Sequence, residues 1–442
     1  MKRQSASRNP VIETHNETCS MKKSYSLIDK VYAWSNLTEA FKSVKRNKGA
    51  SGIDRQSISN FEEELEDNVK RLHLELKTGA YKPTAVRRVE IPKGKGKTRP
   101  LGIPTVRDRV VQQAILNVIQ PIFEPGFHPS SYGYRPHRSC QHAVAKAQMF
   151  LKKYNLRYAV DMDLSKCFDT LNHEQILKSL NRRISDGTLL RLIESFLKSG
   201  VMVEGEYKPT EVGSPQGGVI SPLLMNIYLD EFDQQMKEQN IRIVRYADDI
   251  LIFARTKRKA EQYERKAIAI LEGLKLKINT EKTHICSIDT GVKYLGFVLK
   301  SKYVFIDKER ILRIKEKIRK LTPRNSGIRL VEMIRILNPI LRGWGNYFRI
   351  ANCKGLFGRL MEWTRRRLRM KRMREWKGWK AFFRAYRRQG HSTENLKKLS
   401  MTRWRNSCSK QIHLALPNSW FDEMKLFNLT KLRTNVLFNY YP

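Results

Sequence analysis

The stretch IVRYADDILIF, from Ile243 to Phe253, places two adjacent aspartates between two apolar runs. Apolar runs of this length around a short polar centre predict two β-strands joined at Ala247, Asp248 and Asp249. Neighbouring carboxylates repel each other, and drawing them into a folded protein costs solvation energy. A bound cation or water must offset this cost, so the segment is either a metal site or a solvated surface turn.

A second pair of acids lies at the end of another predicted strand, RYAVDMDLSKCF, which contains Asp161 and Asp163. If this strand neighbours the first two, Asp163, Asp248 and Asp249 converge. Oxygen ligands without a nearby histidine or cysteine favour Mg²⁺ over zinc. Two such ions, about 3.5–4 Å apart, activate an attacking hydroxyl and stabilise a leaving pyrophosphate. We interpret Asp161 as structural, on the opposite strand face from Asp163 if both lie in the strand.

The charge balance indicates a polyanionic partner. The 442 residues include 85 Lys and Arg against 43 Asp and Glu, a formal net charge of +42. Such self-repulsion opposes compaction, and nucleic acid is the simplest explanation for it. Generic basicity and a membrane surface are alternatives, but the basic clusters alternate with Trp inside segments that look folded. Hydrophobic residues make up 40% of the chain, which supports packed cores in two or three domains.

The cysteines and the N-terminus exclude several classes of protein. The six cysteines are scattered without a C-x-x-C pair, so no zinc finger is predicted, and a reducing compartment fits best. No apolar run approaches the length of a membrane span. The first residues lack the apolar core of a secretory signal. We expect residues 1–24 to form a loose tail.

Five motifs occur in one order along the chain: DMDLSKCFD, SPQGG (Ser214 to Gly218), YADD, GLKLKINTEKT and YLGF (Tyr294 to Phe297). Together they resemble the palm motifs of reverse transcriptases. The segments RPLGIPTVRDRVVQQA, SYGYRPHRS and SPQGGVISPLLMNIYLDEFD resemble the bacterial group II intron reverse transcriptases, or intron maturases. LNPILRGWGNYF (Leu337 to Phe348) resembles their domain X. The chain ends without a Cys- and His-bearing endonuclease domain, so it is most similar to the endonuclease-lacking, group IIC-type branch.

This resemblance implies an α+β fold shaped as a right hand. Fingers and an antiparallel-sheet palm are expected over residues 25–305, a helical thumb or domain X over 306–388, and a small basic DNA-binding region over 389–442. Pro339 is expected to kink or break a thumb helix. The implied function is RNA-directed DNA synthesis from dNTPs with two Mg²⁺ ions, together with binding of the parent intron RNA, help in splicing, and retrohoming into target DNA.

Two alternatives to this function are a related bacterial reverse transcriptase of a CRISPR or defence system, and a splicing-only maturase that binds RNA. The expected location is the bacterial cytoplasm, at the nucleoid. The oligomeric state is open.

The resemblance also implies roles for single residues. Asp163 and Asp248 would ligate Mg²⁺ together with the carbonyl of Leu164, and Asp249 would complete the charge balance. Phe168 would lie beneath the sugar and exclude a 2′-hydroxyl, unless it is an ordinary core aromatic.

Four further residues are candidate nucleotide contacts. TAVRRVEIPKGKGKTRPLGIPT predicts a hairpin with a basic tip, flanked by Lys93 and Arg99, which can close over a triphosphate. Gln216 can approach the nucleotide because neighbouring glycines let the backbone come close, or it lies in an ordinary turn. Lys282 would protonate departing pyrophosphate as a general acid, or it is a surface lysine.

Basic residues mixed with aromatic ones are candidate nucleic-acid contacts. Arg135 and Arg138 would contact a template or stabilise the fold. Arg342, Trp344 and Tyr347 would contact intron RNA, although Trp344 equally fits a core position. In TRRRLRMKRMREWKGWKAFFRAYRR, helical spacing directs Met370, together with Trp363 just before the run, inward and the arginines outward, toward phosphates of RNA or target DNA. The alternative is an ordinary solvated helix face. The residues of this run that we select are Arg365, Arg366, Arg367, Arg369, Lys371 and Arg372.

Overall fold

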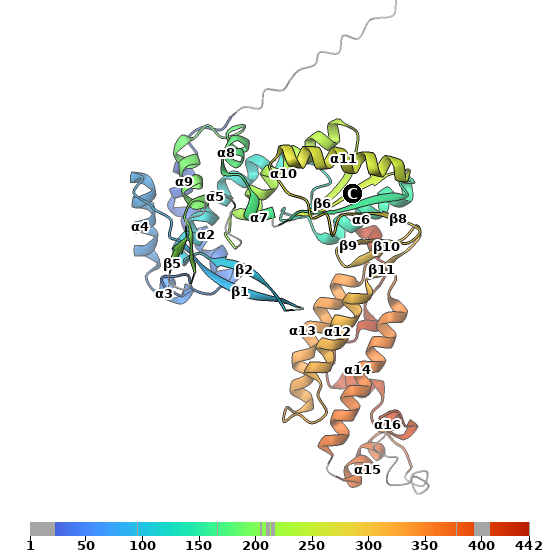
Figure 1. The fold of residues 1–442 in the computed structure, drawn as a ribbon. Helices are drawn as coiled ribbons and strands as arrows, with labels where there is room; N and C mark the ends of the chain where they lie inside the picture. The colour runs from blue at the N-terminus through green and yellow to red at the C-terminus, as the bar shows by residue number, and fades with distance from the viewer. Residues whose placement is uncertain are drawn as a thin grey trace, which may run out of the picture. The chain divides into compact units, whose positions relative to one another are not determined.

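The protein has a mixed α+β architecture that divides into two compact units. The structure, a computed structural model, describes residues 23–94, 96–165, 167–203, 206–208, 213, 217–376, 378–392 and 407–441. Unit 1 comprises Met1–Gly126 and Leu171–Tyr228, and unit 2 comprises Phe127–Thr170 and Leu229–Pro442. Figure 1 shows both units. Within the described parts of the chain, no helix combines the length and the apolar character that a bilayer crossing requires.

Unit 1 is built mainly of amphipathic helices. The longest, α5, begins after Thr105, whose side chain accepts a hydrogen bond from the backbone N–H of Asp108. This N-cap satisfies one of the amide groups that a helix leaves unpaired at its start. The helices are α1 (Ile28–Tyr32), α2 (Trp34–Asn47), α3 (Ile58–Glu63), α4 (Leu65–Thr78), α5 (Val106–Phe123), α8 (His173–Asn181), α9 (Gly187–Leu197) and the first part of α10 (Ser221–Glu238).

A four-stranded sheet in the order β2-β1-β4-β5 completes unit 1. Strands β1 (Val86–Gly94) and β2 (Lys97–Ile103) form the antiparallel hairpin that the sequence predicts. Strand β4 (Val201–Val203) runs parallel to β1, and β5 (Glu206–Lys208) pairs with β4.

The central sheet of unit 2 has the order β6-β7-β3-β8, and all its neighbouring strands are antiparallel. Its strands are β3 (Tyr158–Asp163), β6 (Arg242–Tyr246), β7 (Asp249–Ala254) and β8 (His284–Ser287). Both faces are covered, which explains why the strands read as nearly continuous apolar runs. Helix α6 (Cys140–Lys153) packs on the face that carries Val244, Leu251 and Phe253. Helix α11 (Lys257–Gly273) lies across the sheet from α6 (Figure 1).

A three-stranded sheet and a group of long helices follow in unit 2. The sheet has the order β11-β10-β9, with β9 (Val292–Tyr294), β10 (Phe297–Leu299) and β11 (Val304–Ile306). The helices are α12 (Lys308–Leu321), α13 (Leu330–Phe348), α14 (Lys354–Glu375) and α15 (Trp379–Arg388). Of the two predicted effects of Pro339, a kink or a break, the break does not occur, because helix α13 continues through the proline. Its apolar face, including Leu337 and Leu341, is buried, and this packing outweighs the local cost of the proline.

The described part of the C-terminal segment, residues 407–441, returns along these helices. It contains α16 (Lys410–Ala415), α17 (Asn418–Glu423) and two short 3-10 turns. Phe421, Leu429 and Leu437 belong to the same hydrophobic core as α13 and α14. The ring of Tyr440 meets that of His142 on α6 at 5.3 Å between centroids. This segment is therefore an integral part of unit 2, while residues 393–406 of the predicted DNA-binding region lie outside the described residues.

Candidate active site

The hairpin between β6 and β7 turns through only two residues, Ala247 and Asp248. Tyr246 and Asp249 form the last pair of the ladder. Ala247 adopts a φ of +59°, a conformation that is uncommon for a residue with a Cβ. The turn is held from outside by Gly133, where a Cβ atom would overlap the backbone nitrogen of Ala247. The structure thus contains the two strands, joined at Ala247, Asp248 and Asp249, that the sequence predicts.

The register of the central sheet brings the acids of the two segments together. Asp163, the last residue of β3, is directly opposite Asp249, the first residue of β7. Side chains paired in this way have Cβ atoms about 4.5–5.5 Å apart. Asp248 directly precedes Asp249, in the turn, so three carboxyl groups lie at one end of the sheet.

Asp161 lies on the same face as Asp163, contrary to our expectation. Both residues belong to β3, and side chains two positions apart in a strand point to the same face. Asp161 pairs across the sheet with His284 of β8. Burial raises the pKa of Asp161 to about 6, and the charge of Asp163 adds to this rise. Asp161 is therefore a fourth acid beside Asp163, Asp248 and Asp249.

The electrostatics of the acids favour a cation. Burial raises the pKa of Asp249 to about 7, and the charges of Asp248, Asp163 and Asp161 raise it further in the same direction. Among the described residues, no group of three or more His, Cys, Asp or Glu is already arranged as a metal cage. The donors are nevertheless all carboxylate oxygens, which suits a hard divalent ion, and such an ion would relieve the repulsion.

The side chains of Lys282 and Asn279 donate hydrogen bonds to the carboxylate of Asp163. Lys282 Nζ donates to Asp163 Oδ2 at 2.5 Å, and Asn279 Nδ2 donates to the same oxygen at 3.3 Å. The hydrogen bond to Asp163 raises the pKa of Lys282, so its side chain stays protonated. The sequence motif selected Lys282, but it did not single out Asn279, whose backbone N–H also donates to the Asp163 carbonyl at 2.9 Å.

Leu164 forms an isolated antiparallel bridge with Ile278 beside the acids. The two hydrogen bonds that flank this bridge use the carbonyls of Asp163 and Lys277. The backbone next to Asp163 is thereby held in place.

Phe168 lies in the short helix α7 (Cys167–Thr170), four residues after the Leu164 bridge. Its side chain is 8% exposed, and its ring meets the ring of Tyr134 at 6.5 Å between centroids in an edge arrangement. Tyr134 itself is 53% exposed. Phe168 is therefore packed and also lies close to an exposed aromatic ring.

The other predicted nucleotide contacts lie in unit 1. Lys93 belongs to β1, and Arg99 belongs to β2 opposite Ile91, with an exposed side chain. Gln216 lies outside the described residues. These placements leave the roles of the three residues as predictions.

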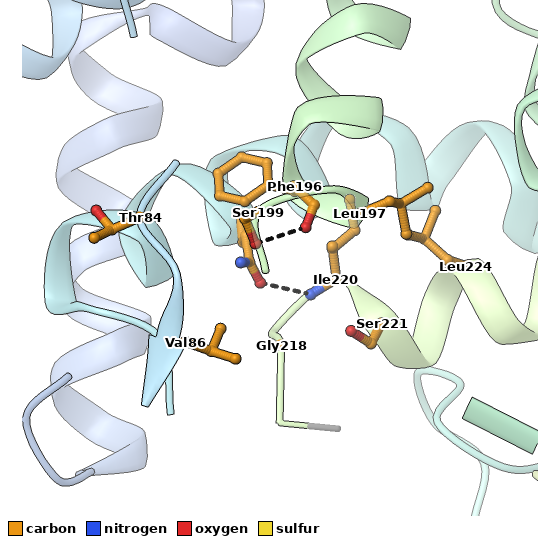
Figure 2. Close-up of a pocket in the computed structure, with 10 residues that line it drawn as sticks. Thr84, Val86, Phe196, Leu197, Ser199, Gly218, Ile220, Ser221 and Leu224 are labelled. Atoms are coloured by element: carbon orange, nitrogen blue, oxygen red, sulfur yellow. Dashed lines mark hydrogen bonds between the residues drawn. The ribbon is translucent and has the colours of Figure 1, made fainter. Parts of the chain in front are cut away.

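The backbone after Gln216 is anchored to α5 by a residue that the motifs did not single out. Gln112 Oε1 accepts hydrogen bonds from the backbone N–H groups of Val219, at 2.7 Å, and Ile220, at 3.4 Å. Figure 2 shows the cavity beside this anchor, whose lining includes Ser199, Ser221 and Leu224. The cavity measures about 10 Å³, which is room for one water molecule. It is therefore a packing feature rather than a substrate pocket.

The arginines of SYGYRPHRS donate hydrogen bonds to backbone carbonyl groups of the protein. Arg135 is 7% exposed, and its Nη1 donates to the carbonyls of His128 and Ser131, both at 2.9 Å. Arg138 donates to the carbonyl of Ser131 at 3.1 Å and lies over the ring of Tyr132. These contacts favour the fold-stabilising alternative for Arg135.

The expectation that the arginines of the basic run face outward is wrong for part of α14. Arg365, Arg369 and Lys371 are buried, with exposed fractions of 6%, 3% and 4%. Helix α14 is covered on more than one side, and carbonyl groups at the ends of neighbouring segments accept its donors. Arg369 Nε donates to the Leu416 carbonyl at 3.0 Å, and Lys371 Nζ donates to the Ser326 carbonyl at 2.6 Å.

The other three basic residues that we selected in α14 differ in exposure. Arg367 donates to Thr322, and Arg372 pairs with Glu375 at 3.0 Å. Arg366 is exposed. Of the six residues selected in this run, Arg366 is therefore the one that is exposed.

In the predicted domain X, the aromatic residues pack inside the unit. Trp344 meets Phe348 and Phe357 at 5.0 and 5.7 Å between centroids. The Tyr347 hydroxyl donates to the Leu295 carbonyl at 2.9 Å. Arg342 is exposed and lies over the ring of Phe427.

An antiparallel sheet whose central strands carry opposed aspartates at one end is consistent with the palm of a right-hand nucleic-acid polymerase. Residues 91–299 match the family described as reverse transcriptase (RNA-dependent DNA polymerase). Residues 311–390 match the group II intron maturase-specific domain. The chain belongs to the family of group II intron reverse transcriptases and maturases, as its motifs predict. The assignment to the endonuclease-lacking, group IIC-type branch stays a prediction.

Curated relatives support this assignment. The chain is 37% identical over 300 residues to protein YkfC of Escherichia coli (strain K12), covering 59% of this chain and 79% of YkfC. It is 39% identical over 198 residues to the group II intron-encoded protein LtrA of Lactococcus lactis subsp. cremoris, covering 44% of this chain and 32% of LtrA. The chain thus spans about a third of the length of LtrA.

Solved structures align less closely. A structure described as a partial Cas6-RT-Cas1–Cas2 complex covers 59% of this chain and 43% of that chain, with 22% identity and a TM-score of 0.36. A TM-score of this size supports no conclusion about the function of this chain.

Proposed function

We propose that the protein is an RNA-directed DNA polymerase that extends a primer 3′-hydroxyl with dNTPs on an RNA template. The observation that carries this proposal is the direct pairing of Asp163 with Asp249, next to Asp248, in a chain of the reverse transcriptase family. The all-oxygen donor set and the raised pKa of Asp249 support binding of two Mg²⁺ ions there.

The residues around the acids have separate tasks in this proposal. Asp163 and Asp248 would hold the ions together with the Leu164 carbonyl, and Asp249 would balance the charge. Two bound Mg²⁺ ions would activate the attacking hydroxyl and stabilise the leaving pyrophosphate oxygens. Lys282, whose Nζ lies 2.5 Å from Asp163 Oδ2 and whose pKa this hydrogen bond raises, would give a proton to the departing pyrophosphate.

Substrate selection is assigned to Phe168 of unit 2 and, from their sequence motifs, to three residues of unit 1. Phe168, which meets the ring of Tyr134 edge-on, would exclude the 2′-hydroxyl of ribonucleotides. Lys93, Arg99 and Gln216 bind the incoming nucleotide. Their assignment rests on the sequence motifs.

The second half of the proposal concerns intron RNA. The maturase-specific domain and the net charge of +42 support binding of the parent group II intron, assistance in its splicing, and copying of the intron into target DNA. Arg342 and Arg366 are exposed on this domain and are proposed phosphate contacts. Such a protein would act in the bacterial cytoplasm, at the nucleoid.

Primer extension tests the polymerase. The purified chain is incubated with a DNA primer on an RNA template, dNTPs and Mg²⁺, and full-length cDNA is expected. Reactions with EDTA, or with primer alone, are the controls and should give none. Binding of intron RNA is measured in parallel against a scrambled RNA of equal length. Tight intron binding without any cDNA would contradict the polymerase and support a splicing-only maturase.

A further inference from the structure

A fully buried ion pair lies directly behind the turn that carries Asp248. Arg245 on β6 and Asp233 on α10 both have side chains that are 0% exposed. Arg245 Nε lies 2.9 Å from both carboxylate oxygens, and its Nη2 donates to Asp233 Oδ2 at 2.6 Å. The guanidinium is therefore fixed in a forked geometry that a lysine cannot reproduce.

The remaining nitrogen of the same guanidinium reaches the turn itself. Arg245 Nη1 donates to the carbonyl of Ala247 at 3.2 Å. Ala247 is the residue with the φ of +59°. A non-glycine residue persists in this conformation only where its surroundings impose it, and the Arg245 contact is one such constraint.

The backbone of Arg245 is constrained as tightly as its side chain. Its N–H donates to the Ser130 carbonyl and its carbonyl accepts from the Tyr132 N–H, both at 2.9 Å. These bonds add the loop before α6 to the edge of the sheet and bring Gly133 against Ala247. Helix α10, the loop and strand β6 thus all converge on the two-residue turn through Arg245.

We propose that Arg245 is a positioning residue of the active site, which holds the Ala247–Asp248 turn so that Asp248 and Asp249 face Asp163. This inference rests on the proposed polymerase function. A buried ion pair is a poor source of stability, because desolvation of both charges offsets their attraction. A pair of this kind behind a strained catalytic turn is therefore better explained by geometry than by stability.

The test separates positioning from folding. In the double variant Arg245→Met/Asp233→Leu, apolar side chains replace both charges, a change that often leaves stability unaltered. Its thermal unfolding midpoint should stay close to that of the native chain. Its kcat for primer extension should fall about a hundredfold, because displacement of a catalytic group by about 1 Å can cost that much. Mn²⁺ affinity, titrated by electron paramagnetic resonance without nucleotide, should weaken several-fold, while the Kd for primer-template stays unchanged.

A second variant and a control complete the design. Arg245→Lys keeps the buried charge pair but loses the fork on Asp233 and the Nη1 contact with the Ala247 carbonyl, and it should show the same losses in kcat and Mn²⁺ affinity. Arg157→Met removes an exposed arginine at the other end of the same sheet, where Arg157 pairs with Asp289 at 2.9 Å, and should change neither.

The outcomes distinguish this inference from the proposed function. Native kcat and Mn²⁺ affinity in a folded double variant, or in a folded Lys variant if the double variant does not unfold cooperatively, overturn the positioning role. Absence of primer extension by the native chain contradicts the proposed function instead, and the Mn²⁺ titration then tests the turn on its own.

Discussion

Asp163 is paired directly with Asp249 across β3 and β7, so two carboxyl groups share one face of the sheet at its end. Burial and the neighbouring acids raise the pKa of Asp249 to about 7, whereas an aspartate in an unfolded chain has a pKa of about 3.9. Between about pH 4 and pH 7 the native state therefore keeps a proton that the unfolded chain has lost. The free energy of unfolding must fall as the pH rises through this window.

Replacement of Asp249 by Asn should reduce this pH dependence in the metal-free protein. The measurement is the free energy of unfolding from urea titrations in EDTA at pH 5 and pH 7.5. The native chain should lose more stability than the variant between these two values. Asp161 and Asp230, whose pKa values burial raises to about 6, keep some of the dependence in both proteins. Mg²⁺ should restore more stability to the native chain at pH 7.5 than at pH 5, and equal pH slopes would contradict the assignment.

Replacement of both Asp248 and Asp249 by Asn should abolish cDNA synthesis on a primed RNA template. A reduction of about a thousandfold or more is expected, because the metal ions supply several kcal/mol of transition-state stabilisation. Intron RNA binding, measured by filter retention, should remain within about twofold, since the basic surface is unchanged. Retained synthesis in Mg²⁺ would refute the role of these residues as metal ligands.

Replacement of Phe168 by Ala should admit ribonucleotides. The ring is packed against Tyr134, so truncation opens space on the side where that exposed tyrosine lies. The measurement is the ratio of kcat/KM for a dNTP to that for the matching rNTP, which should fall at least about tenfold. Tyr134→Phe keeps both rings and is the matched control, with an unchanged ratio. Unaltered sugar selection in the Ala variant would assign Phe168 to the core alone.

The sequence predicts the strand–turn–strand unit at Ala247 because two local signals agree there. Apolar runs flank a short polar turn, and five motifs occur in the order of the family. Asp163 could be placed near the turn only by resemblance, because strand pairing between residues this far apart is not visible in local periodicity. The position of Asp161 could have been predicted from the sequence, because side chains two positions apart in a strand point to the same face, here that of Asp163.

The partners of buried charges could not be predicted. Arg369 donates to a carbonyl 47 residues later in the chain, and Arg245 pairs with Asp233 on a separate helix. Composition reports that a segment is basic, but it does not report which distant carbonyl or carboxylate meets each guanidinium. Burial of an arginine is decided by those tertiary partners.

The division of α14 into buried and exposed arginines predicts two different defects. Arg369→Ala leaves the buried carbonyl of Leu416 without its donor and should lower the free energy of unfolding by about 1–3 kcal/mol. Arg366→Ala, on the exposed side, should leave stability unchanged within about 0.5 kcal/mol. It should instead weaken intron binding and flatten the dependence of log K on log salt by about one unit. Equal effects of the two variants on both measurements would contradict this division.

The two glycines of RGWGNYF in α13 predict opposite effects of the same substitution. A Cβ at Gly345 would lie 2.5 Å from Leu429 Cδ2 and 2.8 Å from Leu432 Cδ1, where the C-terminal segment packs on the helix. Leu429 is fully buried and has little room to move, so Gly345→Ala should lower the free energy of unfolding by about 1–3 kcal/mol.

Gly343 is exposed, and no heavy atom lies within 4 Å of a Cβ built there. Gly343→Ala should therefore raise the free energy of unfolding by about 0.5–1 kcal/mol, because alanine reduces the conformational entropy of the unfolded chain. Urea denaturation of both variants provides the comparison. A Gly345→Ala variant as stable as Gly343→Ala would show that residues 429–432 do not pack on α13 in solution.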